Sequence, residues 1–358
     1  MSKFLRQIFA LIFGAAAFFG CGLVDEDMSD CETDYDINYE LKLVTNMTTE
    51  LSTELTTGLS TELSLAANLQ MAASLKAYLQ EVFTDFAHDV DLSFYDVVAD
   101  EAVGDSLRLH HEYHIIDANQ TTYNLYIPLR PYMHLAVANI ADNGVVALEG
   151  DGLCHSSRLV QEVKDTIGNH KTGLFTARMP LDIVEGVSQT FNVGLYMANC
   201  ASSLIIDTLD SHIRDLRVFA TGFATAFNIC DSTYNFQYTP VVRPDRVESP
   251  ESGLVCFTAV TFPSREPEDL TRSIMETTDP FVSESAVGSL WRYYVYATMP
   301  DGTITETILG VFKPLRAGQF KIIKVKLYPN GTAQPSDPTV GVNITTDWTP
   351  GGEINVDL

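Results

Sequence analysis

The chain has 358 residues, and 46% of them are hydrophobic, which is ample for about two domains with a core each. It carries 22 Lys and Arg against 47 Asp and Glu, for a formal net charge of −25. A field of that sign repels phosphate along the whole approach, so the composition argues against a nucleic acid partner. It fits a soluble, exposed protein.

The first residues have the pattern of an export signal. Lys3 and Arg6 precede an apolar run over residues 8–19, which is too short to span a bilayer comfortably. The run ends at Gly20 and Cys21. A small residue before a cysteine at this point resembles a bacterial lipobox, whose cysteine is acylated and becomes the first residue of the mature protein. We therefore predict a signal peptide over residues 1–20 and a lipid anchor on Cys21.

An ordinary cleaved signal is the alternative, because three alanines at positions 15–17 offer a cut site. Residues 21–34 are acidic and lack apolar partners for a core, which indicates a tether. Its Asp25-Glu26-Asp27 resembles the surface-export signal of Bacteroidota lipoproteins and predicts the outer face of the cell outer membrane. A solvated linker is the alternative for this stretch.

Five cysteines remain once Cys21 is assigned to the lipid: Cys31, Cys154, Cys200, Cys230 and Cys256. Their spacing matches no metal motif, and an exported protein is not kept reduced by the cytosolic thiol pool. Cys200 and Cys230 lie in apolar, strand-like segments and are one candidate pair, although the sequence leaves the disulfide connectivity open. We interpret most of the five as small buried apolar residues.

Hydrophobic periodicity predicts one strand, one helix and then many strands. Alternation over Tyr35–Val44 indicates a first strand, and apolar residues from Leu65 to Phe86 recur at helical spacing after a Thr/Glu/Leu-rich run. The helical insertion is expected at about residues 60–88, with its apolar stripe on a sheet. The later strands are expected at residues 92–95, 123–129, 134–140, 191–197, 204–209, 216–221, 254–262, 291–297 and 320–328.

Turn signals separate many of these strands, and those at Gly302 and Gly331 are typical of hairpins. Short strands with turns and few helices predict an all-β fold with one inserted helix, arranged as two β-sandwich domains in tandem. We expect an N-terminal domain over residues 35–186 and a C-terminal domain over residues 187–358, with the boundary near Gly186.

A histidine-rich segment is the first candidate for chemistry. His110, Glu112 and His114 would share one side of a strand, where metal binding is conceivable, but the spacing is not that of a zinc protease helix. A solvated sheet face is the preferred interpretation. We predict no metal site.

Other candidate residues give no catalytic constellation. Cys154 and His155 are adjacent, but catalytic pairs usually meet from different segments. The acids around Glu266 lie beside prolines, as in an exposed loop. No phosphate-binding loop, dinucleotide fingerprint or nucleophile elbow is present in the sequence. We predict no catalytic residues, no cofactor and no enzyme activity.

Several segments together resemble the FimB-type fimbrial anchor lipoproteins of the Bacteroidales. They are the lipobox cysteine with residues 27–31 (DMSDC), residues 194–199 (GLYMAN), residues 220–224 (ATGFA) and the ending at residues 347–358 (DWTPGGEINVDL). The resemblance spans nearly the whole chain and implies transthyretin-like, Greek-key sandwiches. It also implies a place in the fimbrium, with fimbrial shaft subunits as partners.

In that family, shaft subunits lose a first strand to an arginine-specific protease, and a strand of the next subunit fills the groove. This chain has no arginine between Arg6 and Arg108. Its ending alternates apolar and polar residues after a flexible Pro-Gly-Gly, as a donated strand would. The expected polymer interface comprises Trp348, Gly351, Gly352, Ile354, Val356 and Leu358. We therefore expect a lipid-anchored subunit that holds the fibre to the cell and limits its length.

Two alternatives stay open. The first is a tip or accessory adhesin of the same family, which would contact host or bacterial surface ligands. The second is a glycan-binding surface lipoprotein, for which Trp291, Tyr293 and Tyr294 would have to form an exposed stacking platform. Alternation along their strand places some of these rings in the core instead.

Overall fold

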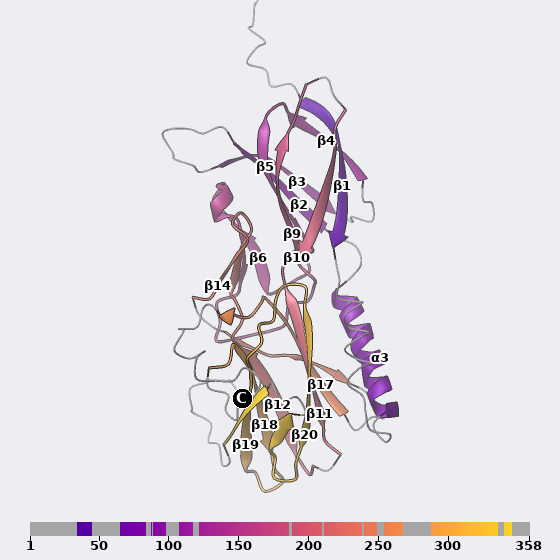
Figure 1. The fold of residues 1–358 in the computed structure, drawn as a ribbon, viewed down its shortest axis with the longest axis vertical. Coiled ribbons are helices and arrows are strands. Elements are labelled where there is room, and N and C mark those ends of the chain that lie inside the picture. The colour runs from indigo at the N-terminus through magenta and orange to yellow at the C-terminus, as the bar shows by residue number, and fades with distance from the viewer. Residues whose placement is uncertain are drawn as a thin grey trace, which may run out of the picture.

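The computed structural model describes residues 34–44, 65–83, 87, 89–97, 107–116, 122–185, 188–209, 211–237, 240–248, 254–267, 288–335 and 340–345. The predicted signal peptide, Cys21, Cys31 and the tail from Trp348 to Leu358 lie outside these residues. The molecule is long, with one curved sheet at one end, a sandwich at the other and the helix α3 along one side of the sandwich (Figure 1). Within the described residues, no helix has the length and apolar character to cross a membrane.

The first sheet has seven strands in the order β3-β2-β5-β9-β10-β1-β4. Apolar side chains alternate along its strands and fill its concave side. The strands are β1 (Asp34–Val44), β2 (Asp89–Asp96), β3 (Arg108–Ile116), β4 (Thr122–Pro128), β5 (Pro131–Ala138), β9 (Phe175–Asp182) and β10 (Thr190–Met197).

The two end strands of this sheet are joined by a side chain. The Tyr113 hydroxyl on β3 donates a hydrogen bond to the Tyr126 carbonyl on β4 and accepts one from the Tyr126 amide. Because β3 and β4 stand at opposite ends of the strand order, the sheet must curl to bring them together. The curl encloses the apolar side chains.

The second half is a sandwich with a separate core between its two sheets. One sheet has the order β16-β17-β11-β20-β21, and the other has the order β22-β19-β18-β12-β15-β8. The strands are β8 (Thr166–Ile167), β11 (Cys200–Asp207), β12 (Asp215–Thr221), β15 (Val241–Val242), β16 (Asp245–Glu248), β17 (Leu254–Thr261), β18 (Trp291–Thr298), β19 (Ile304–Val311), β20 (Phe320–Leu327), β21 (Ala333–Pro335) and β22 (Val340–Thr345).

Besides the first sheet and the two sheets of the sandwich, a small four-stranded sheet, called the third sheet here after the third apolar cluster beside it, draws its strands from both halves of the chain. Its order is β14-β13-β7-β6, and the short 3-10 helix η2 (Cys154–Ser156) precedes β7. A third apolar cluster lies between it and its neighbours. Its strands are β6 (Val146–Glu149), β7 (Arg158–Gln161), β13 (Ala226–Asn228) and β14 (Thr233–Asn235).

The helix α3 (Leu65–Val82) follows β1 in the chain but contacts β16 and β17 of the sandwich. Its buried face includes Met71, Leu75 and Leu79, which belong to the same apolar cluster as the interior of the first sheet. That cluster continues to Cys256 and Val260 on the outer face of the sandwich sheet. The two halves therefore share one continuous core beside α3.

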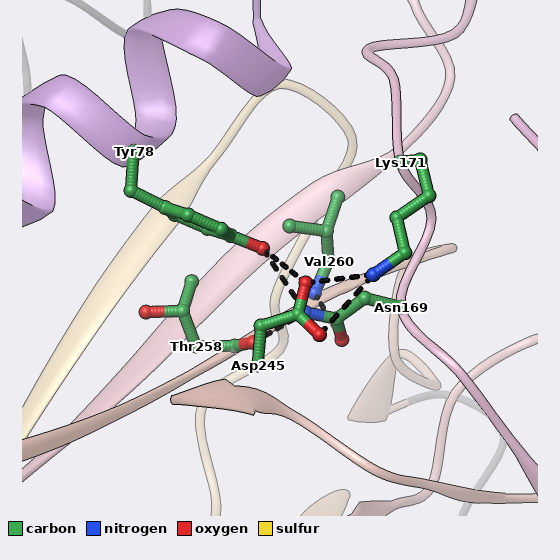
Figure 2. A network of polar contacts seen from close by, with 6 residues as sticks. All are labelled: Tyr78, Asn169, Lys171, Asp245, Thr258 and Val260. Carbon is green, nitrogen blue, oxygen red and sulfur yellow. Dashed lines mark hydrogen bonds and ion pairs between the residues drawn. The ribbon is translucent and has the colours of Figure 1, made fainter. Parts of the chain in front are cut away.

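A partly buried polar network fastens α3 to the segment between β8 and β9 (Figure 2). The Tyr78 hydroxyl donates to Asp245 at 2.9 Å and accepts from the Asn169 amide at 3.2 Å. Asn169 also donates to the Thr258 carbonyl and accepts from the Val260 amide. Burial and the Asp245 carboxylate raise the pKa of Tyr78 above its ordinary value, so this hydroxyl keeps its proton and remains the donor to Asp245.

The mostly β fold with one inserted helix is confirmed, and the helix lies inside the predicted insertion. The division at Gly186 stays a prediction. Strand β10 follows Gly186 in the sequence but pairs with β1 and β9 in the first sheet. Conversely, β8 precedes Gly186 but pairs with β15 of the sandwich.

Candidate assembly site around the first strand

The first strand of the chain is an interior strand of its sheet. Strand β1 runs parallel to β10 from Asn38 to Val44 and antiparallel to β4 from Asp34 to Glu40. Its main chain is therefore paired along both edges, and the two sets of pairs overlap at Asn38, Tyr39 and Glu40. A segment bound in this way is part of the folded sheet and leaves no vacant place between β10 and β4.

The side chains of β1 alternate between the core and the outside, as the sequence predicts. Ile37 and Tyr39 are buried, whereas Asp36 and Glu40 are exposed. This alternation fixes the register, because a shift of one residue would turn both apolar side chains outward. The strand is thus specified by its own sequence as well as by its main-chain pairing.

Tyr39 reaches across the curled sheet to a histidine on β5. Its hydroxyl forms a hydrogen bond with Nε2 of His134, although β9 and β10 separate the two strands in the sheet order. The other ring nitrogen, Nδ1, lies 3.0 Å from the Ser93 carbonyl of β2. Since a carbonyl can only accept, Nδ1 carries the proton, and Nε2 accepts from the tyrosine.

The environment of this pair keeps both groups neutral. Burial lowers the pKa of His134 to about 4 and raises the pKa of Tyr39. The imidazole also stacks on Phe94 with 4.3 Å between the ring centroids. A neutral, fully packed pair with no solvent contact is suited to holding β1 in place and not to proton transfer.

The described end of the chain lies at a sheet edge. Strand β22 ends at Thr345, pairs with β19 and is the end strand of its sheet. The predicted interface residues Trp348, Gly351, Gly352, Ile354, Val356 and Leu358 lie beyond it, outside the described residues. The structure therefore places the start of the tail at an edge, and the role of the tail stays a prediction.

The histidine-rich segment forms the strand β3, and its side chains have structural partners. His114 contacts the Asp91 carboxylate at 2.6 Å, and His110 lies 3.3 Å from Asp96, which also binds Arg130 at 2.9 Å. No group of three or more His, Cys, Asp or Glu side chains suited to a metal ion occurs among the described residues. The sheet-face interpretation fits these contacts.

The other candidate residues also have structural surroundings. Cys154 is buried, and burial raises the pKa of its thiol, which is the opposite of what a nucleophile needs. The Glu266 carboxylate accepts two hydrogen bonds from Arg316, at 2.7 and 3.0 Å, which lower its pKa. A glycosidase acid requires a raised pKa, so Glu266 lacks that property.

The proposed aromatic platform does not form. Trp291 and Tyr293 are buried in the sandwich core, and the Trp291 indole donates to the Lys313 carbonyl at 3.0 Å. The prediction that alternate members of this cluster face the core is confirmed. Among the described residues, the most exposed tyrosines are instead Tyr126 on β4 and Tyr196 on β10.

The Tyr39–His134 contact was not predicted from the sequence. His134 lies in a predicted strand whose residues 134–138 are all buried, so its place in that apolar run puts it in the core whichever face it occupies. A buried histidine needs a partner, and that need was a usable signal. The identity of the partner depends on the curl of the sheet and could not be predicted from local sequence.

Comparison with known proteins gives matches in structure only. No family model matches the chain, and no curated protein gives a significant match. One similar solved structure is a candidate adhesin from Bacteroides thetaiotaomicron, with 9% identity, a TM-score of 0.49 and coverage of 87% of this chain and 99% of that one. Another is a candidate adhesin from Bacteroides ovatus, with 11% identity, a TM-score of 0.48 and coverage of 89% and 97%.

A third similar structure is the fimbrial anchor protein Mfa2 from Porphyromonas gingivalis. It has 10% identity and a TM-score of 0.44, and the match covers 87% of this chain and 99% of that one. These three structures are thus of two candidate adhesins and one fimbrial anchor protein.

Proposed function

We propose that this chain is a surface-exposed fimbrial subunit, lipid-anchored to the outer membrane through Cys21, that attaches the fibre to the cell and limits its length. The observation that carries the proposal is the retained first strand. Strand β1 is paired on both edges and fixed by the buried Tyr39–His134 hydrogen bond.

A polymer built by strand addition is asymmetric, and its two ends differ. Each shaft subunit accepts a strand into a vacant groove and donates one to a neighbour, whereas a subunit at one end only donates and a subunit at the other end only accepts. In this chain the place between β10 and β4 is filled by its own β1. It therefore belongs at the donating end, and the lipid on Cys21 would put that end at the cell.

The absence of arginine around β1 would explain why a protease does not remove this strand from the folded chain. Between Arg6 and Arg108 the sequence offers no site to an arginine-specific protease. We expect Ser29→Arg, in the predicted tether before β1, to create such a site. Cleavage there would leave the lipid on a short fragment and β1 with the rest of the folded chain, so fibres would appear in the culture medium.

The matched control is Ser29→Lys, which adds the same charge without an arginine site and should leave fibres on the cells. Electron microscopy and immunoblots of cells and medium measure the difference. If fibres of the Ser29→Arg strain stay attached although the chain is cut after residue 29, the proposed anchoring through the N-terminal lipid is wrong.

Immunogold labelling separates this proposal from a tip adhesin. A tip subunit would be the accepting end of the polymer and would need a vacant groove. We expect gold particles at the cell-proximal end of the fibres, and label at the distal end would contradict the assignment.

A further inference from the structure

Two cysteines that are distant in the sequence lie together at the small third sheet. Cys154 belongs to η2 just before β7, and Cys230 follows β13. The two strands are antiparallel neighbours, with Arg158 opposite Asn228.

Two further contacts bind the flanking segments to each other. The Ile229 amide donates to the Ser157 carbonyl at 3.1 Å, and the Asn228 side chain donates to the His155 carbonyl at 2.9 Å. These contacts hold the two segments that carry the cysteines together, whether or not the thiols bond to each other.

Their side chains meet in one apolar cluster. Cys154 is 1% exposed and Cys230 is 9% exposed, and both belong to the cluster around the third sheet. The two thiols also influence each other, because Cys230 contributes to the raised pKa of Cys154. Both groups are thiols in the structure.

The other described cysteines are placed where they cannot join this pair. Cys200 belongs to the sandwich core, where its thiol donates to the Thr261 and Phe262 carbonyls at 3.5 Å. Cys256 lies on the opposite face of the same sheet, in the cluster beside α3. The pairing of Cys200 with Cys230 considered from sequence is therefore not favoured by this structure, which puts them in different clusters.

We propose that Cys154 and Cys230 form a disulfide in the exported protein. Two S–H bonds break and one S–S bond forms. The two electrons and two protons pass to the disulfide of a thiol oxidoreductase, which leaves as a dithiol. The bond would link a segment of the N-terminal half to a segment of the C-terminal half across the third sheet.

The chemistry of the folded thiols indicates when the bond would form. Burial, and then the neighbouring Cys230, raises the pKa of Cys154, so little thiolate is present once the core has closed. Oxidation is therefore expected during export and folding, before the cluster is buried. Reduced protein that has already folded should oxidise slowly.

The test uses the full chain isolated from the cell envelope. The protein is denatured in N-ethylmaleimide without reductant, digested and analysed by mass spectrometry. We expect the peptides of Cys154 and Cys230 to be linked and unlabelled, whereas Cys200 and Cys256 carry the label. Label on both Cys154 and Cys230, or a link from either one to Cys31, overturns the proposal.

Stability provides a second readout. The melting temperature of the isolated protein should fall by about 5 °C or more on reduction. Cys154→Ala and Cys230→Ala should each remove this sensitivity to reductant, whereas Cys256→Ala should retain it. If the wild-type melting temperature is the same with and without reductant, the two cysteines are buried free thiols.

Discussion

Tyr39 and His134 are both fully buried, and each satisfies a hydrogen-bonding requirement of the other. The tyrosine hydroxyl needs an acceptor, and Nε2 needs a donor once Nδ1 has donated to Ser93. Because the partners come from β1, β5 and β2, the contact ties the first strand to distant parts of the sheet. This residue pair therefore holds β1 in the sheet by a side-chain contact, in addition to its main-chain pairing.

We expect Tyr39→Phe to lower the free energy of unfolding by about 1–3 kcal/mol, because it leaves Nε2 of buried His134 without a donor. The ring is kept, so packing changes little. Tyr126→Phe is the matched control, since that side chain is 56% exposed, and its effect should stay within about 0.5 kcal/mol. Urea unfolding of the three proteins checks this, and equal stability of the two variants would contradict it.

Two buried histidines make stability depend on pH. Burial lowers the pKa of His134 to about 4 and that of His170 to about 3, whereas an unfolded histidine titrates near pH 6.5. As the pH falls below about 6.5, the unfolded chain binds protons that the folded chain does not. The stabilisation is therefore complete above about pH 6.5 and is lost as the pH falls toward 3–4.

Each such histidine should contribute a slope of about 1.4 kcal/mol per pH unit in the free energy of unfolding between roughly pH 4 and 6. His170→Gln should reduce the measured slope by about that amount. His155→Asn changes an exposed histidine and is the control. Denaturant titrations at several pH values measure the slopes, and an unchanged slope in His170→Gln would show that His170 does not titrate as its burial implies.

At the scale of elements, tight turns and the hairpins around them can be predicted from the sequence, because they depend on neighbouring residues. Gly302 and Gly331 adopt positive φ angles of 90° and 80°, and the strands on either side of each pair with one another as predicted. The predicted strands do not include β9, which contains Pro180, a residue disfavoured within sheets. The structure accommodates Pro180 because β10 pairs with β9 only at Phe175 and Thr176, so one edge of β9 is unpaired in the ladder at the proline.

The helix α3 shows what the local pattern leaves out. Its apolar period predicts packing on a sheet, but not that the sheet belongs to the other half of the chain. The choice depends on partners such as Val247, Cys256 and Val260, which follow the helix by more than 160 residues. Such long-range pairing has no signature within the helix itself.

We expect Leu75→Ala to destabilise the protein by about 2–5 kcal/mol, because Leu75 is completely buried between α3 and the sandwich sheet. Lys76→Ala changes the neighbouring exposed residue and should have an effect within about 0.5 kcal/mol. The fluorescence of Trp291 in a Trp348→Phe background reports unfolding of the sandwich. If Leu75→Ala leaves that transition unchanged, α3 does not support the sandwich.

At the scale of the whole molecule, the two halves are joined by exchanged elements. Strand β8 pairs with β15, β7 pairs with β13, and α3 covers the sandwich sheet. Asn169, between β8 and β9, has its buried amide bonded to the sandwich strand β17. A subunit held in this way would transmit a pulling force through many contacts, which suits the proposed position between a lipid and a fibre.

The tail would be the other point of attachment in this proposal. Ile354, Val356 and Leu358 would enter pockets of a neighbouring subunit if the tail is donated as a strand, while the residues between them would face solvent. Deleting residues 352–358 should therefore release fibres into the medium or make them longer, because the anchor no longer caps them.

A matched pair of double variants tests the alternation itself. Ile354→Asn with Val356→Asn should reproduce the deletion, because polar groups would be buried in apolar pockets without partners. Glu353→Gln with Asn355→Asp alters the opposite face and should leave fibres attached at normal length. Electron microscopy of cells and medium measures both properties. Equal behaviour of the two double variants would show that alternate side chains do not determine the attachment, and unchanged fibres after the deletion would exclude strand donation by this tail.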